Sequence, residues 1–231
     1  MLKDDKFPSM HNIKTNKVEI KLSDDGSHTL FVPDLNEHYH SVNGAVNEAM
    51  HVFIQAGLNQ VVVSKLKILE FGFGTGLNAF LTAINKGDKE IHYHSLEKYP
   101  VVTETIKQLN YSLLFDGQYS DLFQKIHQVN WEKEHEIEAN FYLTKQQGDF
   151  KTAEPENKYH LIYFDAFAPD IQPDLWSKAI FTKAYNALLP GGILTTYCAK
   201  GVVRRTMQEV GFKVERLPGP PGKREMLRAI K

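Results

Sequence analysis

Cysteine is almost absent from this chain. Among 231 residues there is one cysteine, Cys198, so no intramolecular disulfide can form. A zinc site built on several thiolates is excluded for the same reason. The composition therefore gives no sign of the oxidising compartments in which disulfide-bonded proteins are found.

Long apolar runs and an excess of one charge are absent as well. No stretch approaches the roughly 20 apolar residues that span a bilayer, and the first residues, MLKDDKFPSMHNIK, lack the apolar core of a signal peptide. The formal net charge is −1, so a nucleic-acid partner would have to be held by a local basic patch. We therefore expect a cytoplasmic protein with no membrane partner.

What the chain does contain is an alternation of strand-like and helix-like segments. Between residues 17 and 33, two β-rich runs flank Asp25-Gly26, which is typical of a hairpin, and residues 41–57 have helical spacing. Strands are expected at 66–71, 90–96, 138–146, 159–165, 191–198, 212–217 and 224–230. Helices are expected at 76–86, 100–114, 174–188 and 201–210. Residues 116–137 fit a helix over the sheet edge.

This order predicts an α/β fold with a doubly wound, mainly parallel sheet of seven strands in residues 61–231. Residues 1–60 are expected to form a hairpin-and-helix extension packed on that core. Ligands of such sheets bind beyond the carboxyl ends of the strands. The informative residues are therefore those that follow each apolar run.

The first run ends in EFGFGTGLN, residues 70–78, which holds a G-x-G-x-G turn. Glycine tolerates positive φ and lets a ligand approach backbone N–H groups. A dinucleotide turn would need glycine where Leu77 stands, and a P-loop would need a Gly-Lys-Ser/Thr ending. The turn therefore suits a nucleoside without phosphates, such as S-adenosylmethionine, although an ordinary strand-to-helix turn would look the same. The expected ligand-binding residues are Glu70, which would reach the ammonium group, with Gly72, Gly74, Gly76 and Asn78.

Three further acidic residues each follow a separate predicted strand. Glu97 is placed to accept hydrogen bonds from ribose hydroxyls, although a surface acid at a strand end fits position 97 as well. Asp149 is placed to accept from the adenine amine, although a helix N-cap or turn aspartate fits position 149 as well. Asp165 ends the fourth run, near the place where a methyl group would be presented, and Phe167 would wall the site. Together with Glu70, this set predicts a Rossmann-like class I methyltransferase in which Asp165 both contacts the cofactor and acts in catalysis.

Several motifs resemble the MnmC-type tRNA methyltransferase family, from about residue 17 to the end of the chain. They are the glycine turn, DAFAP at 165–169, YCAKGVVRR at 197–205, GKREML at 222–227, and Tyr39-His40-Ser41 with Gly44 and Glu48. The resemblance implies methylation of 5-aminomethyl-2-thiouridine at the tRNA wobble position, giving 5-methylaminomethyl-2-thiouridine. Many family members also carry an FAD-dependent oxidoreductase domain. This chain is too short for it, so we expect no FAD site and a separate upstream enzyme that supplies the amine.

The acceptor amine sets the chemistry expected of the site. An alkylammonium has no lone pair, so Asp165 would orient the amine and either take its proton or leave it to water, because a carboxylate also raises the amine's pKa. Tyr197 and Phe167 would line the nucleobase pocket. From Lys200 to Lys231, nine Lys and Arg residues stand against three acids. Candidates for phosphate contacts around the anticodon loop are Arg204, Arg205, Lys223 and Arg224.

Other interpretations stay open at this point. The same fold accepts small-molecule or protein amines and serves aminopropyl transfer, and a non-catalytic nucleoside- or RNA-binding module would share the turn. The basic residues also fit a solvated helix face and an edge strand protected by charge. The pairs His38 with His40 and His92 with His94 have i, i+2 spacing but no obvious carboxylate cluster, so no metal site is expected.

Overall fold

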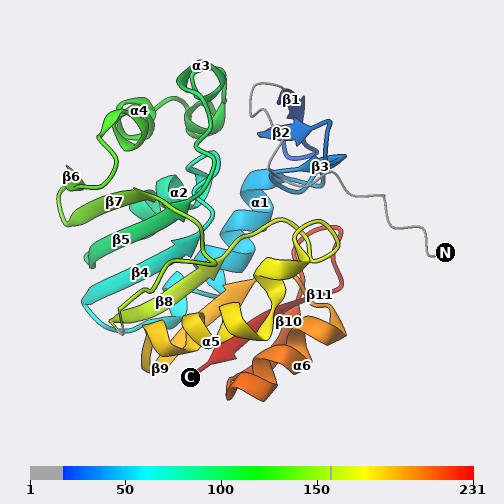
Figure 1. The fold of residues 1–231 in the computed structure, drawn as a ribbon. Helices are drawn as coiled ribbons and strands as arrows, with labels where there is room; N and C mark the ends of the chain where they lie inside the picture. Colours follow the sequence, from blue (N-terminus) through cyan, green and yellow to red (C-terminus); the bar gives the residue numbers. More distant parts are fainter. Residues whose placement is uncertain (1–17, 157) are drawn as a thin grey trace.

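A mixed sheet of eight strands forms the centre of the protein, in a computed structural model that describes residues 18–156 and 158–231 (Figure 1). The strand order is β10 (Lys213–Pro218), β11 (Glu225–Ile230), β9 (Leu188–Thr196), β8 (Tyr159–Phe164), β4 (Lys65–Phe71), β5 (Glu90–Glu97), β7 (Phe141–Gln147) and β6 (Glu134–Glu138). The five strands from β9 to β7 run parallel, and the strands outside them pair antiparallel. The predicted doubly wound α/β fold is confirmed.

Both faces of the sheet are covered, as the alternation along β4 illustrates. Leu66 and Ile68 are fully buried in one apolar cluster, while Leu69 and Phe71 belong to a second cluster on the opposite face. The first cluster includes residues of α1 (Ala45–Ala49), α2 (Leu77–Asn85) and α4 (Ser120–Gln128). The second includes α5 (Lys178–Ala187) and α6 (Gly201–Val210), which lie together on the other side of the sheet (Figure 1).

The N-terminal segment forms a small sheet of its own. Strands β1 (Glu19–Leu22), β2 (His28–Val32) and β3 (Glu37–His38) pair antiparallel, so the hairpin expected at Asp25-Gly26 is confirmed. The helix expected over 41–57 begins at Ala45 as α1 and continues as a π-helix, Met50–Gln55, before a 3₁₀ turn at Leu58–Gln60. The boundary placed between residues 60 and 61 stays a prediction.

The helix predicted over 100–114 was wrong in its extent. The chain forms only α3 (Thr103–Ile106) and a 3₁₀ turn, Tyr111–Phe115. Between them, Asn110 accepts a hydrogen bond from the His28 backbone N–H and donates one to the Gly26 carbonyl, both at 2.8 Å. The chain is therefore tied to the N-terminal hairpin in the segment where the prediction continued the helix.

Residues 116–137 are only partly helical, and this accounts for the eighth strand. After α4 the charged run at 132–138 enters β6, which pairs antiparallel with β7 as an edge strand. Ile137 is buried while its charged neighbours lie partly or fully exposed, a pattern suited to a protected edge. The seven-strand count was therefore one strand short.

Smaller differences concern element ends. The helix expected over 174–188 is a 3₁₀ turn, Pro173–Trp176, followed by α5, and β9 begins at Leu188 rather than 191. Across the described ranges, no helix has the length and apolarity to span a membrane, and no cluster of His, Cys, Asp and Glu suits a metal ion. The opening segment interpreted for targeting, 1–14, lies outside the described residues.

Candidate active site

The glycine turn joins β4 to α2 and is fixed by the two neighbouring strands. The Gly72 N–H donates to the Leu96 carbonyl at 3.0 Å, and the Asp165 N–H donates to the Phe71 carbonyl at 3.1 Å. Gly72 has φ +98°, and a Cβ there would lie 2.8 Å from the Asp165 carbonyl oxygen. Only glycine fits this close approach. The turn therefore holds the ends of β4, β5 and β8 against one another.

Glu70 is a fully buried carboxylic acid directly before the turn. Its Oε2 accepts a hydrogen bond from the Ser95 hydroxyl at 2.6 Å. Its Oε1 has no hydrogen bond of ordinary length among residues 18–156 and 158–231, although the Asn78 and Tyr93 side chains lie near enough to lower the pKa of this carboxyl. Burial raises the pKa of Glu70 to about 8, the Ser95 hydrogen bond opposes this, and the charge of Asp165 adds to it. A buried acceptor oxygen without a partner is a binding position for a cationic or donor group.

Asp165 lies at the end of β8 and is bound by Asn78 from the first turn of α2. The Asn78 Nδ2 donates to Asp165 Oδ2 at 2.8 Å, and Asn78 Oδ1 is buried and unpaired within the described chain. Burial raises the pKa of Asp165 to about 7, and the Asn78 hydrogen bond opposes the shift. Near neutral pH the carboxyl group can therefore exist in either protonation state.

Glu97, at the end of β5, reaches across to the glycine turn. Its Oε2 accepts from the Gly74 N–H at 3.0 Å and its Oε1 from the Tyr99 N–H at 2.7 Å. Burial raises the pKa of this carboxyl, while the backbone hydrogen bonds lower it. Both carboxylate oxygens are thus bound by backbone N–H groups, and the role of Glu97 toward ribose hydroxyls stays a prediction.

Asp149 follows β7 and stands in a tight turn. Its Oδ1 accepts from the Lys151 N–H at 2.9 Å, and its Oδ2 accepts from Lys98 Nζ at 2.8 Å. The neighbouring Gly148 N–H donates to the Glu97 carbonyl at 2.9 Å, which places this turn beside the end of β5. Asp149 thus has the contacts of a turn aspartate, and its role toward a nucleoside stays a prediction.

Two residues of the N-terminal segment cover the glycine turn and were not singled out as functional from the sequence. His40 Nε2 lies 2.7 Å from the Thr75 hydroxyl, and burial lowers the pKa of His40 to about 4, so the ring is neutral. The Tyr39 ring packs edge-on against Phe167 at 5.1 Å between centroids. A Cβ on Gly74 would lie 3.1 Å from that same tyrosine ring. Only the resemblance of the Tyr39-His40 motif pointed to them.

The loop after Asp165 is held by aromatic residues. The Tyr197 hydroxyl donates to the Ala166 carbonyl at 2.8 Å, and the Trp176 indole N–H donates to the Phe167 carbonyl at 2.7 Å. Phe167 and Tyr197 both remain partly exposed. The structure therefore places the two predicted pocket residues beside Asp165.

The four predicted phosphate contacts do not share one environment. Arg205 on α6 and Arg224 before β11 are exposed, and Arg204 is partly exposed. Lys223 instead forms an ion pair with the buried Glu48 of α1, and its Nζ lies 4.2 Å from the centre of the Tyr197 ring. This lysine is therefore partly exposed but has its ammonium group bound beside Tyr197.

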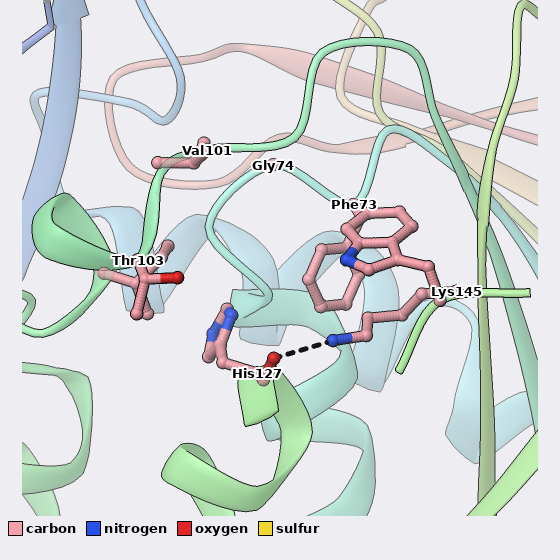
Figure 2. Close-up of a pocket in the computed structure, with 8 residues that line it drawn as sticks. Phe73, Gly74, Val101, Thr103, His127 and Lys145 are labelled. Atoms are coloured by element: carbon pink, nitrogen blue, oxygen red, sulfur yellow. Dashed lines mark hydrogen bonds between the residues drawn. The ribbon is translucent and has the colours of Figure 1, made fainter. Parts of the chain in front are cut away.

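A small cavity adjoins the glycine turn (Figure 2). It is lined by Phe73, Gly74, Val101, Thr103, Ile106, His127, Trp131 and Lys145. The buried Lys145 ammonium donates to the His127 carbonyl at 2.9 Å and lies 5.6 Å from the centre of the Phe73 ring. Burial lowers the pKa of Lys145 to about 8. The packing of these residues supports the glycine turn.

Comparison with known proteins agrees with this geometry. Residues 90–231 match a family described as S-adenosyl-L-methionine-dependent methyltransferase. The chain is 31% identical over 214 residues to the tRNA 5-methylaminomethyl-2-thiouridine biosynthesis bifunctional protein MnmC of Cupriavidus necator, covering 85% of this chain and 32% of that protein. It is 30% identical over 209 residues to MnmC of Leptospira borgpetersenii, covering 82% of this chain and 31% of that protein. The chain thus spans about a third of these relatives' length.

Two solved structures share the fold. MnmC2 from Aquifex aeolicus has a TM-score of 0.72 at 24% identity, covering 92% of this chain and 70% of that one. Spermidine synthase from Thermotoga maritima has a TM-score of 0.54 at 14% identity, covering 93% of this chain and 72% of that one. At these identities the likeness concerns the arrangement of the chain alone.

Proposed function

Since this chain belongs to the family of S-adenosyl-L-methionine-dependent methyltransferases, we propose that it methylates the aminomethyl nitrogen of 5-aminomethyl-2-thiouridine at the wobble position of tRNA. The observation that carries the proposal is the Asn78–Asp165 pair, which sets a carboxyl group of pKa about 7 directly beside the glycine turn. The names of the relatives, which specify 5-methylaminomethyl-2-thiouridine biosynthesis, support this acceptor.

The residues around the turn fit S-adenosylmethionine. The unpartnered, fully buried Glu70 Oε1 is an acceptor for the ammonium group of its amino-acid tail, and the glycines keep the backbone open to it. Glu97 would receive the ribose hydroxyls and Asp149 the adenine amine. When bound, this cofactor supplies an electrophilic methyl group on a sulfonium, so the leaving group is neutral.

Asp165 would act on the acceptor amine. A pKa of about 7 makes this carboxyl a better proton acceptor at neutral pH than an ordinary aspartate. An arriving ammonium would favour the carboxylate form, so the group can orient the amine nitrogen and then take its proton. Asn78 keeps Oδ2 in place and leaves Oδ1 of Asp165 for the substrate.

The rest of the acceptor would be received by the surrounding elements. Phe167 and Tyr197 lie beside Asp165 and offer apolar faces to a nucleobase. Arg205 and Arg224 are exposed, and Arg204 is partly so, where phosphates of the anticodon region can reach them. An upstream enzyme would provide the aminomethyl group.

The other candidates are less well supported. A methyltransferase family match argues against a non-catalytic binding module and against aminopropyl transfer, and the likeness to spermidine synthase is one of fold. Small-molecule or protein amines receive no support from the relatives, whose names specify a tRNA nucleoside.

The test is transfer of a labelled methyl group to tRNA that carries 5-aminomethyl-2-thiouridine, read by nucleoside mass spectrometry. We expect 5-methylaminomethyl-2-thiouridine to form, and no product with the same tRNA as an unmodified transcript. Equal labelling of both RNAs, or of free amines in preference to tRNA, would remove the wobble nucleoside as the acceptor.

A further inference from the structure

Two segments that are far apart in the sequence meet on the acceptor side of the proposed site. Glu48 of α1 is 8% exposed and forms an ion pair with Lys223, which lies in the turn between β10 and β11 and 175 residues further along. The same turn is fixed by the His51 ring, which donates to the Pro218 carbonyl at 2.8 Å. The ion pair is therefore held in place by the packing around it.

The ammonium group of Lys223 sits in surroundings that suit any primary alkylammonium. A carboxylate faces it from Glu48, and the face of the Tyr197 ring lies 4.2 Å from its nitrogen. A carboxylate combined with an aromatic face is the chemistry by which proteins bind alkylammonium ligands. The acceptor amine has this same group, a nitrogen on a methylene carbon.

The position of these surroundings relative to Asp165 gives them a role in the reaction. The Tyr197 hydroxyl donates to the carbonyl of Ala166, the residue that follows Asp165, at 2.8 Å. Burial is the main cause of the raised pKa of Asp165, the Glu48 charge adds to it, and the Lys223 charge opposes it. Glu48 and Lys223 thus both lie close enough to Asp165 to act on its charge.

We propose that Glu48 and Tyr197 form the receptor for the ammonium group of the acceptor, and that Lys223 occupies this receptor until the substrate displaces it. The inference rests on the proposed function for the identity of the amine. Displacement exchanges one ammonium for another, so the buried Glu48 carboxylate is never left without a counter-charge. Lys223 lies in a turn and, once displaced, is free to contact a phosphate of the bound RNA.

The proposal is tested by binding of two nucleosides that differ only in the group on the methylene carbon, which is an ammonium in one and a neutral hydroxyl in the other. Isothermal titration compares 5-aminomethyluridine with the neutral 5-hydroxymethyluridine, on protein saturated with S-adenosylhomocysteine. We expect the native protein to prefer the amine. Glu48→Gln should reduce that preference roughly tenfold or more, since it removes a charge-assisted hydrogen bond. Lys223→Met removes the internal competitor, so it should tighten binding of the amine and leave the alcohol unchanged.

The two variants should change binding of the amine in opposite directions, and this distinguishes a receptor from a structural ion pair. If both variants weaken both nucleosides alike, or if the native protein shows no preference for the amine, the proposal is overturned. Glu215→Gln is the matched control, because Glu215 binds Arg228 at 2.8 Å within the same β10–β11 hairpin. Glu48→Asp restores the charge and should recover part of the preference, which excludes a folding defect as the cause.

The same proteins keep this result separate from the proposed function. If the native protein prefers the amine nucleoside but does not methylate tRNA carrying 5-aminomethyl-2-thiouridine, the receptor stands and the wobble acceptor fails. If tRNA is methylated with equal efficiency by Glu48→Gln and the native protein, the receptor fails and the function stands.

Discussion

The two sides of the proposed active site are built in different ways. The cofactor side consists of residues at the ends of neighbouring parallel strands, joined by short contacts such as Ser95 to Glu70 and Gly74 to Glu97. The acceptor side is assembled from distant parts of the chain, with Glu48 near one end and Lys223 near the other. The sheet sets the positions of the residues on the cofactor side. The acceptor side depends on how the N-terminal segment and the β10–β11 hairpin pack together.

This difference predicts how sensitive each side of the site is to substitutions elsewhere in the chain. The carboxyl ends of parallel strands lie at the same edge of the sheet. The residues of the cofactor side should therefore keep their positions when the N-terminal segment or the β10–β11 hairpin is changed. The acceptor side should be more easily altered, because it depends on contacts between two separate segments, such as Glu48 with Lys223 and His51 with Pro218. Substitutions on each side test this difference.

Asp165→Asn should have the largest effect, because Asp165 is the residue that we propose acts directly on the acceptor amine. We expect methyl transfer to fall by roughly 10² to 10⁴-fold, since the amide can neither take a proton nor balance an ammonium. Binding of S-adenosylmethionine should change little, because Glu70, Glu97 and the turn are intact. Single-turnover rates together with titration calorimetry measure both quantities, and an unchanged rate would remove Asp165 from the chemistry.

Gly76→Ala tests how strictly the turn requires glycine at this position. Gly76 has φ +72°, and a Cβ there would lie 2.7 Å from the His127 ring. Gly191 has a similar φ of +78° with nothing within 4 Å, so Gly191→Ala is a control for backbone strain alone. We expect about 1 kcal/mol of destabilisation at Gly191 and about 2–4 kcal/mol at Gly76, where crowding is added. If both variants lose the same free energy of unfolding in denaturant, the turn accommodates the added methyl group at Gly76 without a further cost.

Glu70→Gln should change the pH dependence of stability. The folded pKa of Glu70 is about 8, above its ordinary value of 4.5, so the folded state holds the proton more tightly than the unfolded state. Stability should therefore fall as the pH rises from about 4.5 to about 8. Glutamine stays neutral and should remove part of that loss, on the order of 1–3 kcal/mol at pH 9. Unfolding curves of both proteins at pH 5 and pH 9 would show it, and parallel curves would contradict it.

The strand ends could be predicted from the sequence because their signals are local. Glu70, Glu97 and Asp165 each follow an apolar run, and the period of the runs fixes where a strand stops. The acceptor side has no local signal: nothing around Glu48 or Lys223 indicates a partner 175 residues away. The break at Asn110 and the strand at 134–138 were missed for related reasons, since one depends on a distant hairpin and the other on an edge position.

Thr75→Val should have the smallest effect and examines the hydrogen bond between His40 of the N-terminal segment and the glycine turn. Thr75 is fully buried, and its hydroxyl meets His40 Nε2 at 2.7 Å and the Tyr111 hydroxyl at 3.3 Å. Valine keeps the shape but leaves both partners unpaired, at a cost of about 1 kcal/mol. If the segment helps to close the cofactor side, the Kd for S-adenosylmethionine should rise roughly fivefold while the rate at saturation is kept, and Thr75→Ser should behave as the native protein. Because burial holds the pKa of His40 at about 4, the effect should be the same from pH 6 to pH 8. A loss of rate at saturation instead would mean that the two sides of the site are coupled through this hydroxyl.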